Sequence, residues 1–176
     1  YARSGGGMTL SGGEPLMQGD FALALLREAR RRRIGTAVET CGHVQWETLD
    51  EACRMARTLL FDLKHVDPAR HEAGTGVPNT LILENFLRVM EHHPKLHVMV
   101  RTPVIPGFND DEAAISAILD VLAPYPHVEY SLLPYHRLGT QKYHFLGRET
   151  PMGEVKLDEA RMSGLLRLVA ARRGKG

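Results

Sequence analysis

The sequence has few cysteines, no excess of either charge and no long hydrophobic run. Only Cys41 and Cys53 occur among 176 residues, and they match neither a disulfide framework nor a CxxC or zinc pattern. A formal net charge of +1 favours neither nucleic acid nor an anionic membrane as the main partner. Apolar runs are short and interrupted by charges, so neither a membrane span nor a signal peptide is expected. We therefore predict a cytoplasmic chain with buried thiols and no nucleic-acid or membrane partner.

The composition is that of an ordinary globular domain. Hydrophobic residues make up 43% and charged residues 24% of the chain, which excludes disordered and fibrous classes. The length suits one hydrophobic core, so residues 1–176 are predicted to form a single domain. The chain begins with Tyr1 rather than Met, and we expect further residues upstream.

Short runs with strand character alternate with longer segments of helical period. This alternation predicts five β-α units and a parallel sheet, either in an α/β barrel or in a doubly wound fold. The widest predicted loops are 64–78, whose His65 and His71 we expect to be solvated, and 134–156. The predicted strands are 8–10, 36–40, 59–63, 97–104 and 128–133, and the predicted helices are 21–33, 47–57, 79–92, 109–122 with Asn109 as N-cap, and 157–172.

Unusual polar residues follow the predicted strands. Glu14, Glu39 and Asp62 come after the first three strands, and Arg101 and His136 accompany the last two. The carboxyl ends of parallel strands are where α/β folds bind their ligands. These side chains are therefore expected to converge at one edge of the sheet and to form a ligand site.

The segment GGGMTLSGGEP, residues 5–15, combines bare backbone with one carboxylate. It matches neither a P-loop nor GxGxxG, and no Lys follows the glycines, so a nucleotide phosphate site is disfavoured. Glu14 instead favours a cationic ligand group such as an ammonium, while Gly12 and Gly13 let a ligand approach the main chain. The alternative is a tight turn that presents a surface Glu to a helix N-terminus.

Two carboxylates, Glu39 and Asp62, end consecutive predicted strands and should lie close together. Carboxylates at short range need a cation, a shared proton or intervening solvent. Lys64 is near them in the sequence, so a metal site and a pocket for a carboxylate ligand are both compatible with the pattern. An internal salt bridge at the end of the sheet is the third alternative.

Five segments, in this order, resemble the activating enzymes of glycyl radical enzymes, within the radical S-adenosylmethionine (SAM) superfamily. The resemblance spans nearly the whole chain and implies a partial, TIM-like (β/α) barrel of the radical SAM type. About five β-α units would be present and the first unit missing. The segments are YARSGGGMTLSGGEPLMQ (1–18), AVETCGHVQWE (37–47), LLFDLKHVD (59–67), VRTPVIPGFNDDE (100–112) and LLPYHRLGTQKY (132–143).

The resemblance implies a SAM site. The loop from Gly12 to Glu14 would receive the amino group of SAM. Lys64 and Arg101 would contact its ribose or its carboxylate, and His136 would lie near the adenosyl group.

The resemblance also implies a monovalent cation beside the carboxylate of SAM. Its ligands would be the side chains of Glu39 and Asp62. The main-chain carbonyls of Thr40 and Leu60 would complete the site. Glu39 stands where the pyruvate formate-lyase activating enzyme has Asp, which weakens this part of the resemblance.

The cluster-binding motif of the family is not in this sequence. Relatives hold a 4Fe–4S cluster through CxxxCxxC, and two cysteines cannot supply three thiolates. That motif would lie upstream of Tyr1, so the chain would be the SAM-binding portion of the protein. It would contain no catalytic residue and would be inactive alone.

The resemblance implies a radical SAM oxidoreductase in full-length form. It would generate a 5′-deoxyadenosyl radical and abstract hydrogen from a glycine of a partner enzyme, which would be formate-lyase-like, a dehydratase or a lyase. Flavodoxin or ferredoxin would donate the electron. The alternatives are a non-catalytic module that binds SAM or a partner, and a radical SAM enzyme that acts on a small molecule.

Overall fold

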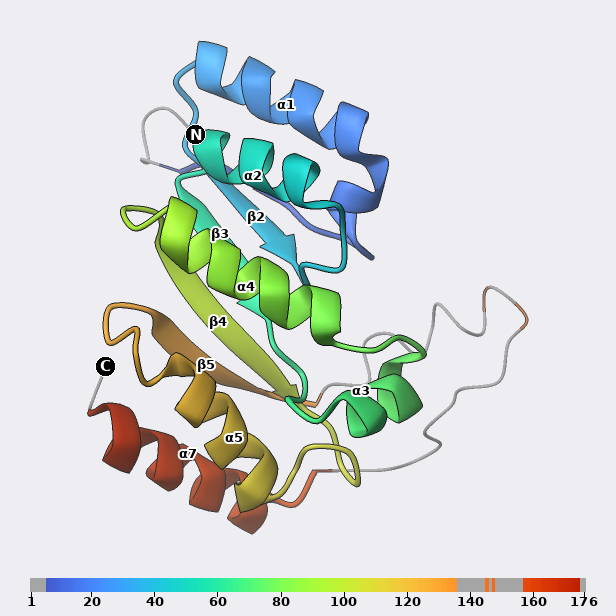
Figure 1. The fold of residues 1–176 in the computed structure, drawn as a ribbon, viewed down its shortest axis with the longest axis vertical. Coiled ribbons are helices and arrows are strands. Elements are labelled where there is room, and N and C mark those ends of the chain that lie inside the picture. The colour runs from blue at the N-terminus through green and yellow to red at the C-terminus, as the bar shows by residue number, and fades with distance from the viewer. Residues whose placement is uncertain (1–5, 136–144, 146, 148–156, 175–176) are drawn as a thin grey trace.

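The computed structural model describes residues 6–135, 145, 147 and 157–174. Within these residues one parallel sheet has the strand order β1-β2-β3-β4-β5 (Figure 1). Every predicted strand is confirmed, and no end differs by more than one residue. The strands are β1 (Met8–Leu10), β2 (Thr36–Thr40), β3 (Thr58–Asp62), β4 (His97–Val104) and β5 (Glu129–Pro134).

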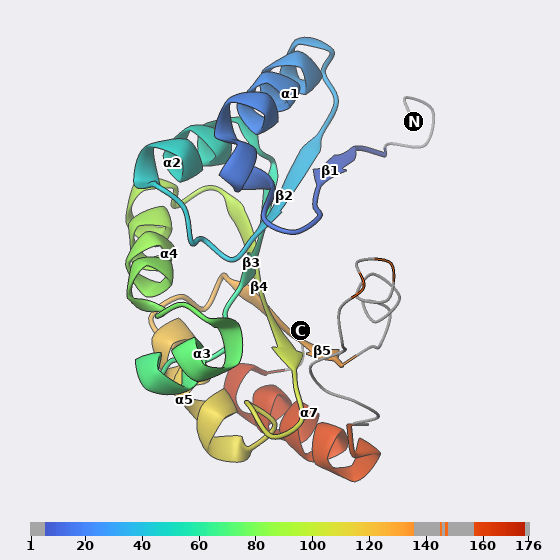
Figure 2. The same cartoon turned by 90° about the vertical axis from the view of Figure 1, so that its right-hand side faces the viewer.

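Helices connect the strands, and Figure 2 shows α1, α2 and α4 along one face of the curved sheet. This arrangement confirms the predicted α/β class and corresponds to part of a barrel. No helix in the described ranges is long and apolar enough to cross a membrane. The helices are η1 (Pro15–Gln18), α1 (Gly19–Arg31), α2 (Trp46–Met55), α3 (Pro68–Thr75), α4 (Thr80–His92), α5 (Glu112–Leu122) and α7 (Glu159–Arg173).

Side chains along each strand alternate between the two faces of the sheet, as strand geometry requires. In β4, Val98 and Val100 are buried beneath the helices, whereas Met99 and Arg101 are partly exposed on the other face. Phe61 in β3 is fully buried on the helix side. The face without the helices is therefore the one that carries polar side chains toward the ends of the strands.

The prediction that Asn109 caps helix α5 is wrong. Asp111 is the N-cap, and its Oδ1 accepts a hydrogen bond of 2.8 Å from the amide of Ala114. Asn109 is fully buried, and its Nδ2 donates to the carbonyls of Lys64 at 2.7 Å and Pro103 at 2.9 Å. An amide side chain both donates and accepts, so Asn109 can satisfy the main chain of two loops.

The predicted loop 64–78 contains helix α3. Asp67 caps its N-terminus, and Gly76, with φ of 83°, ends it in the left-handed conformation. The helix was missed because its sequence, PARHEAGT, has no apolar stripe of helical period. His65 and His71 are both buried, which corrects the prediction that they are solvated.

Candidate functional site

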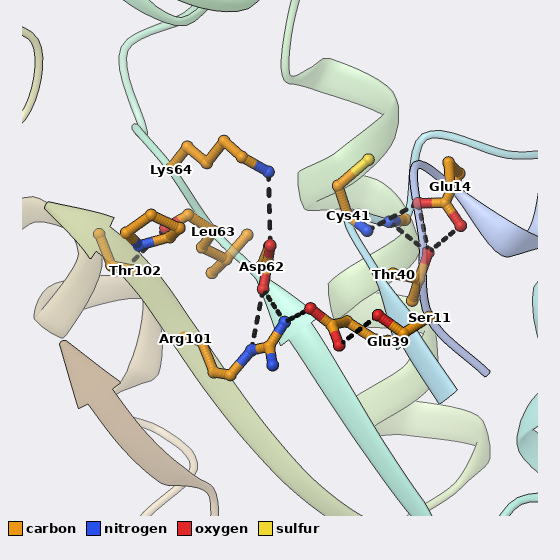
Figure 3. A network of polar contacts seen from close by, with 12 residues as sticks. Ser11, Glu14, Glu39, Thr40, Cys41, Asp62, Leu63, Lys64, Arg101 and Thr102 are labelled. Atoms are coloured by element: carbon orange, nitrogen blue, oxygen red, sulfur yellow. Dashed lines mark hydrogen bonds and ion pairs between the residues drawn. The ribbon is translucent and has the colours of Figure 1, made fainter. Parts of the chain in front are cut away.

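The residues predicted at the strand ends converge at one edge of the sheet (Figure 3). Glu39, Asp62 and Arg101 come from β2, β3 and β4, and Glu14 follows the loop after β1. Their meeting confirms the expectation that these side chains converge at one edge of the sheet, and ligand binding there stays a prediction. His136 lies outside the described residues.

Arg101 bridges the two carboxylates of the site. Its Nη2 lies 2.5 Å from Oε1 of Glu39 and 2.8 Å from Oδ1 of Asp62, and its Nε lies 3.0 Å from the same Asp62 oxygen. The parallel register pairs Asp62 with Arg101 on neighbouring strands, so the contact follows from the strand alignment. Of the three alternatives left open by the sequence, the internal salt bridge is the one present in this structure.

The ion pair shifts the titration of its members. The hydrogen bond from Arg101 lowers the pKa of Glu39, although partial burial works in the opposite direction. Ser11 Oγ donates to the other oxygen of Glu39 at 2.8 Å and adds to this effect. Burial opposes the charge of Arg101, but its hydrogen bonds to Glu39 and Asp62 outweigh burial and raise its pKa. Both partners are thus favoured in their charged forms.

Lys64 completes the charged group, but its contact is looser. Its Nζ lies 3.6 Å from Oδ2 of Asp62, beyond hydrogen-bond distance, and its side chain is partly exposed. The hydrogen bond from Asn109 fixes the main chain of Lys64 without restraining its ammonium group. Lys64 therefore offers three N–H donors to an anionic group that enters this end of the sheet.

Glu14 is held by donors from two elements. Its Oε1 accepts from the amide of Leu16, which makes Glu14 the N-cap of η1. Thr40 Oγ1 lies 2.9 Å from both carboxylate oxygens, and the amide of Cys41 donates to Oε2 at 2.8 Å. The alternative of a helix-capping Glu is thus partly right. The carboxylate nevertheless points toward the end of β2 rather than toward open solvent.

The glycines before Glu14 leave the main chain uncovered. Gly12 has φ of 145°, a conformation that L side chains rarely adopt. A Cβ atom built on either Gly12 or Gly13 would meet no other described atom within 4 Å. The space beside this loop is therefore open to a ligand that approaches the backbone.

A hollow of about 240 Å³ adjoins Glu14 and Lys64. One carboxylate and one ammonium at its wall offer the complementary charges that an α-amino acid group needs. The rest of the wall is mainly apolar. The lining residues are Glu14, Met17, Cys41, His43, Lys64, His71, Thr75, Val77 and Ile82.

The two cysteines do not fit a 4Fe–4S cluster. Burial raises the pKa of Cys41, and it raises the pKa of Cys53 to about 12, so both favour the thiol over the thiolate that metals bind. In the part of the chain that the structure describes, no group of three His, Cys, Asp or Glu side chains could hold a metal ion. No step that depends on a cluster can be assigned to these residues.

The oxygen atoms predicted to bind a monovalent cation are present, but a positive charge already lies among them. Glu39 of β2 is paired with Leu60 of β3, and Thr40 is the next residue of β2, so these three residues lie close together. Carboxylate and carbonyl oxygens suit a hard cation. Arg101 pairs with the carboxylates of Glu39 and Asp62 and balances one of their two negative charges, so a cation there would share them with the guanidinium.

Three polar groups of the site were missed by the sequence analysis. Only the carbonyl of Thr40 had been assigned a role, whereas its hydroxyl contacts Glu14. Ser11 had been noted only as part of the loop, and Asn109 was predicted to be a cap. A Thr that ends a strand just before Cys41-Gly42 is a signal that was available, because such hydroxyls often bond the turn that follows.

The fold and site together define the protein class. A curved parallel sheet of β-α units with its polar site at the carboxyl ends of the strands is part of an α/β barrel. Residues 2–117 match the family model described as the radical SAM superfamily. The chain belongs to the radical SAM superfamily.

Individual relatives show which proteins of this superfamily the chain is similar to. The chain is 63% identical over 165 residues to the isethionate sulfite-lyase activating enzyme of Desulfovibrio desulfuricans, covering 94% of this chain and 53% of that protein. It is 41% identical to the choline trimethylamine-lyase activating enzyme of Oleidesulfovibrio alaskensis, and the match covers 91% of this chain and 53% of that protein. The chain thus spans about half the length of these curated relatives.

A solved structure supports the same relationship. A domain of a pyruvate-formate lyase-activating enzyme from Bacteroides vulgatus superposes with a TM-score of 0.75 at 32% identity, covering 95% of this chain and 94% of that one. These matches confirm the resemblance to glycyl radical enzyme activating enzymes, and they confirm the partial radical SAM barrel.

Proposed function

We propose that this chain is the SAM-binding part of an activating enzyme for a glycyl radical enzyme. The observation that carries the proposal is Glu14, whose carboxylate follows an open glycine loop and accepts hydrogen bonds from three donors. Such a group accepts an ammonium and not a phosphate. Membership of the radical SAM superfamily supports SAM as the molecule that carries this ammonium.

The proposal assigns roles to the residues of the site. The segment from Gly12 to Glu14 binds the amino group of SAM, because the loop is open and the carboxylate is fixed. Lys64 and Arg101 contact the ribose or the carboxylate, since both are cations at the same edge of the sheet. His136 is proposed to lie near the adenosyl group. These residues bind and orient SAM.

A monovalent cation at Glu39, Thr40, Leu60 and Asp62 is a second part of the proposal. It would balance the carboxylates of Glu39 and Asp62 together with Arg101, which is their partner in this structure. The carboxylate and carbonyl oxygens support cation binding, whereas the ion pairs of Arg101 compete with the cation for the carboxylates.

The chemistry belongs to the full-length protein. With SAM bound, one-electron reductive cleavage would release methionine and supply a 5′-deoxyadenosyl radical for abstraction of a hydrogen atom from a glycine of the partner enzyme. The residues described here contribute binding and orientation. The 4Fe–4S cluster and the donor, flavodoxin or ferredoxin, are proposed for the full-length protein only. Residues 1–176 alone are therefore proposed to be inactive.

The proposed partner is a lyase of the glycyl radical type. Three relatives that are 63%, 58% and 57% identical to this chain are isethionate sulfite-lyase activating enzymes. A fourth, 54% identical, is a (2S)-3-sulfopropanediol sulfolyase activating enzyme. A sulfite-releasing carbon–sulfur lyase is therefore the first partner to test.

The test combines the full-length protein, SAM and a reductant under anaerobic conditions with an isethionate sulfite-lyase. Electron paramagnetic resonance should then detect a glycyl radical on the lyase, and none when SAM is omitted. SAM cleavage without a protein radical on this or other glycyl radical lyases would instead favour a small-molecule substrate. Binding without any SAM cleavage would favour a non-catalytic module.

A further inference from the structure

Thr40 is the last residue of β2, and only 3% of its surface is exposed. Its hydroxyl oxygen lies 2.9 Å from each carboxylate oxygen of Glu14. The same oxygen lies 2.9 Å from the amide nitrogen of Gly42. One hydroxyl thus connects the strand end, the turn that follows it and the carboxylate proposed to bind the ligand (Figure 3).

The direction of these hydrogen bonds follows from the groups involved. The amide of Gly42 can only donate, so the Thr40 hydroxyl oxygen accepts this hydrogen bond through one of its lone pairs. The single hydroxyl proton then points to Glu14, which accepts it. The turn that sets this direction requires a glycine at position 42. Gly42 has φ of 73°, and a Cβ atom there would lie 2.3 Å from the ring of Phe61.

The number of donors limits what else Glu14 can bind. A carboxylate has about four lone-pair sites. Among the residues that the structure describes, the amides of Leu16 and Cys41 and the hydroxyl of Thr40 occupy three of them. About one site remains, and the three donors fix the plane of the carboxylate that carries it. A ligand ammonium would therefore receive one direct hydrogen bond in a defined direction.

We propose that Thr40 is a positioning residue, which holds the Glu14 carboxylate so that its remaining lone pair faces the amino group of SAM. This inference rests on the proposed function, because it needs a ligand with an ammonium at Glu14. Thr40 itself does not touch the ligand in this account. Its hydroxyl acts through Glu14, in addition to the role proposed for its carbonyl.

The side chain permits a matched pair of variants. Thr40→Val keeps the branched shape and the strand preference but removes the hydroxyl. Thr40→Ser keeps the hydroxyl and removes one methyl group. A role in packing alone would make Val the milder change, whereas a positioning role makes Ser the milder change. Thr40→Ala replaces Val if the valine variant does not fold, as judged by thermal melting.

The experiment measures two affinities of the full-length protein by calorimetry. S-adenosylhomocysteine carries the amino acid group, and 5′-methylthioadenosine lacks it. Thr40→Val is expected to weaken binding of S-adenosylhomocysteine about tenfold. Affinity for 5′-methylthioadenosine should stay unchanged, and Thr40→Ser should bind both within about twofold of the wild type.

Two results would overturn the positioning role. One is wild-type affinity for S-adenosylhomocysteine in Thr40→Val, and the other is an equal loss for both ligands. Glu14→Gln serves as the reference variant. If it too binds S-adenosylhomocysteine like the wild type, the proposed function fails. If only Glu14→Gln loses affinity, the function stands and the inference about Thr40 is wrong.

Discussion

Arg101 and Glu39 join β4 to β2 across the intervening strand, with 2.5 Å between Nη2 and Oε1. The same nitrogen also contacts Asp62 on β3, so one guanidinium connects three strands toward their carboxyl ends. The side chain of Arg101 is only 13% exposed, which limits screening by solvent. The contact thus stabilises the sheet and sets the charge of the site.

Replacing Arg101 should therefore destabilise the fold. The loss should be larger when the substitution removes the positive charge as well as the planar, forked set of N–H donors. Arg101→Lys keeps the charge but cannot reproduce the fork geometry, and we expect a loss of about 1 kcal/mol in unfolding free energy. Arg101→Leu leaves Glu39 with only the Ser11 hydroxyl and Asp62 with only the looser contact to Lys64, and it should cost about 3 kcal/mol. Urea unfolding measures both, with the exposed Arg167→Lys on α7 as control. Equal midpoints for Arg101→Leu and the wild type would contradict this role.

The ion pair should also make stability depend on pH. The pKa of Glu39 in the folded protein lies below its ordinary value of 4.5. Its charged form therefore stabilises the fold above that pH, and the contribution is lost as pH falls through the lowered pKa. The difference in unfolding free energy between wild type and Glu39→Gln should be about 1 kcal/mol near neutral pH.

This difference should shrink when urea unfolding is repeated at acid pH, below the lowered pKa of Glu39. Glu91→Gln, at an exposed position of α4, is the control and should show no such change. A difference between wild type and Glu39→Gln that is constant with pH would show that the pair is not electrostatic in origin.

The roles of Asn109 and Asp111 can be distinguished by the loss in unfolding free energy when each side chain is removed. Asn109→Ala would remove the hydrogen bonds that its side chain makes to the partly buried carbonyls of Lys64 and Pro103 and to the amide of Ile105, at about 2–3 kcal/mol. Asp111→Ala removes an N-cap and should cost about 1 kcal/mol. Chemical denaturation of the two variants decides between them. The reverse order would restore Asn109 as the cap.

Gly13 provides a test of the open loop. A Cβ atom at Gly13 would meet no atom of the described residues within 4 Å, and its φ is not in the disfavoured positive range, so Gly13→Ala should leave stability unchanged. If the ligand approaches this backbone, the same methyl group should weaken S-adenosylhomocysteine binding by about tenfold or more. Gly164→Ala, in helix α7, is the matched control. Unchanged calorimetric affinity for Gly13→Ala would place the ligand elsewhere.

The sequence predicted the strands well because buried parallel strands are short apolar runs between helical segments. The run at Leu59 to Leu63 is an example, and its observed ends shift by only one residue. Helix α3 escaped prediction because His71 is its only buried residue. Asn109 and Asp111 are both good N-cap residues, so only their three-dimensional contacts could separate them.

The position of the site was predictable, whereas its internal contacts were not. Residues that follow parallel strands must meet at one edge, which placed Glu14, Glu39 and Asp62 together. Which cation would balance the carboxylates depends on side-chain conformations that no sequence pattern specifies. The hydroxyl of Thr40 was overlooked for a similar reason, since its contact with Glu14 joins residues 26 positions apart.

The calorimetric affinity of the full-length Glu14→Gln variant for S-adenosylhomocysteine is the sharpest test of the proposed SAM site. A charge-assisted hydrogen bond contributes about 1.5–3 kcal/mol, so affinity should fall roughly tenfold to a hundredfold. Thermal melting should show that the variant is folded, and 5′-methylthioadenosine should bind as it does to the wild type. Wild-type affinity for S-adenosylhomocysteine in the folded variant would contradict the role of Glu14 as the ammonium-binding carboxylate.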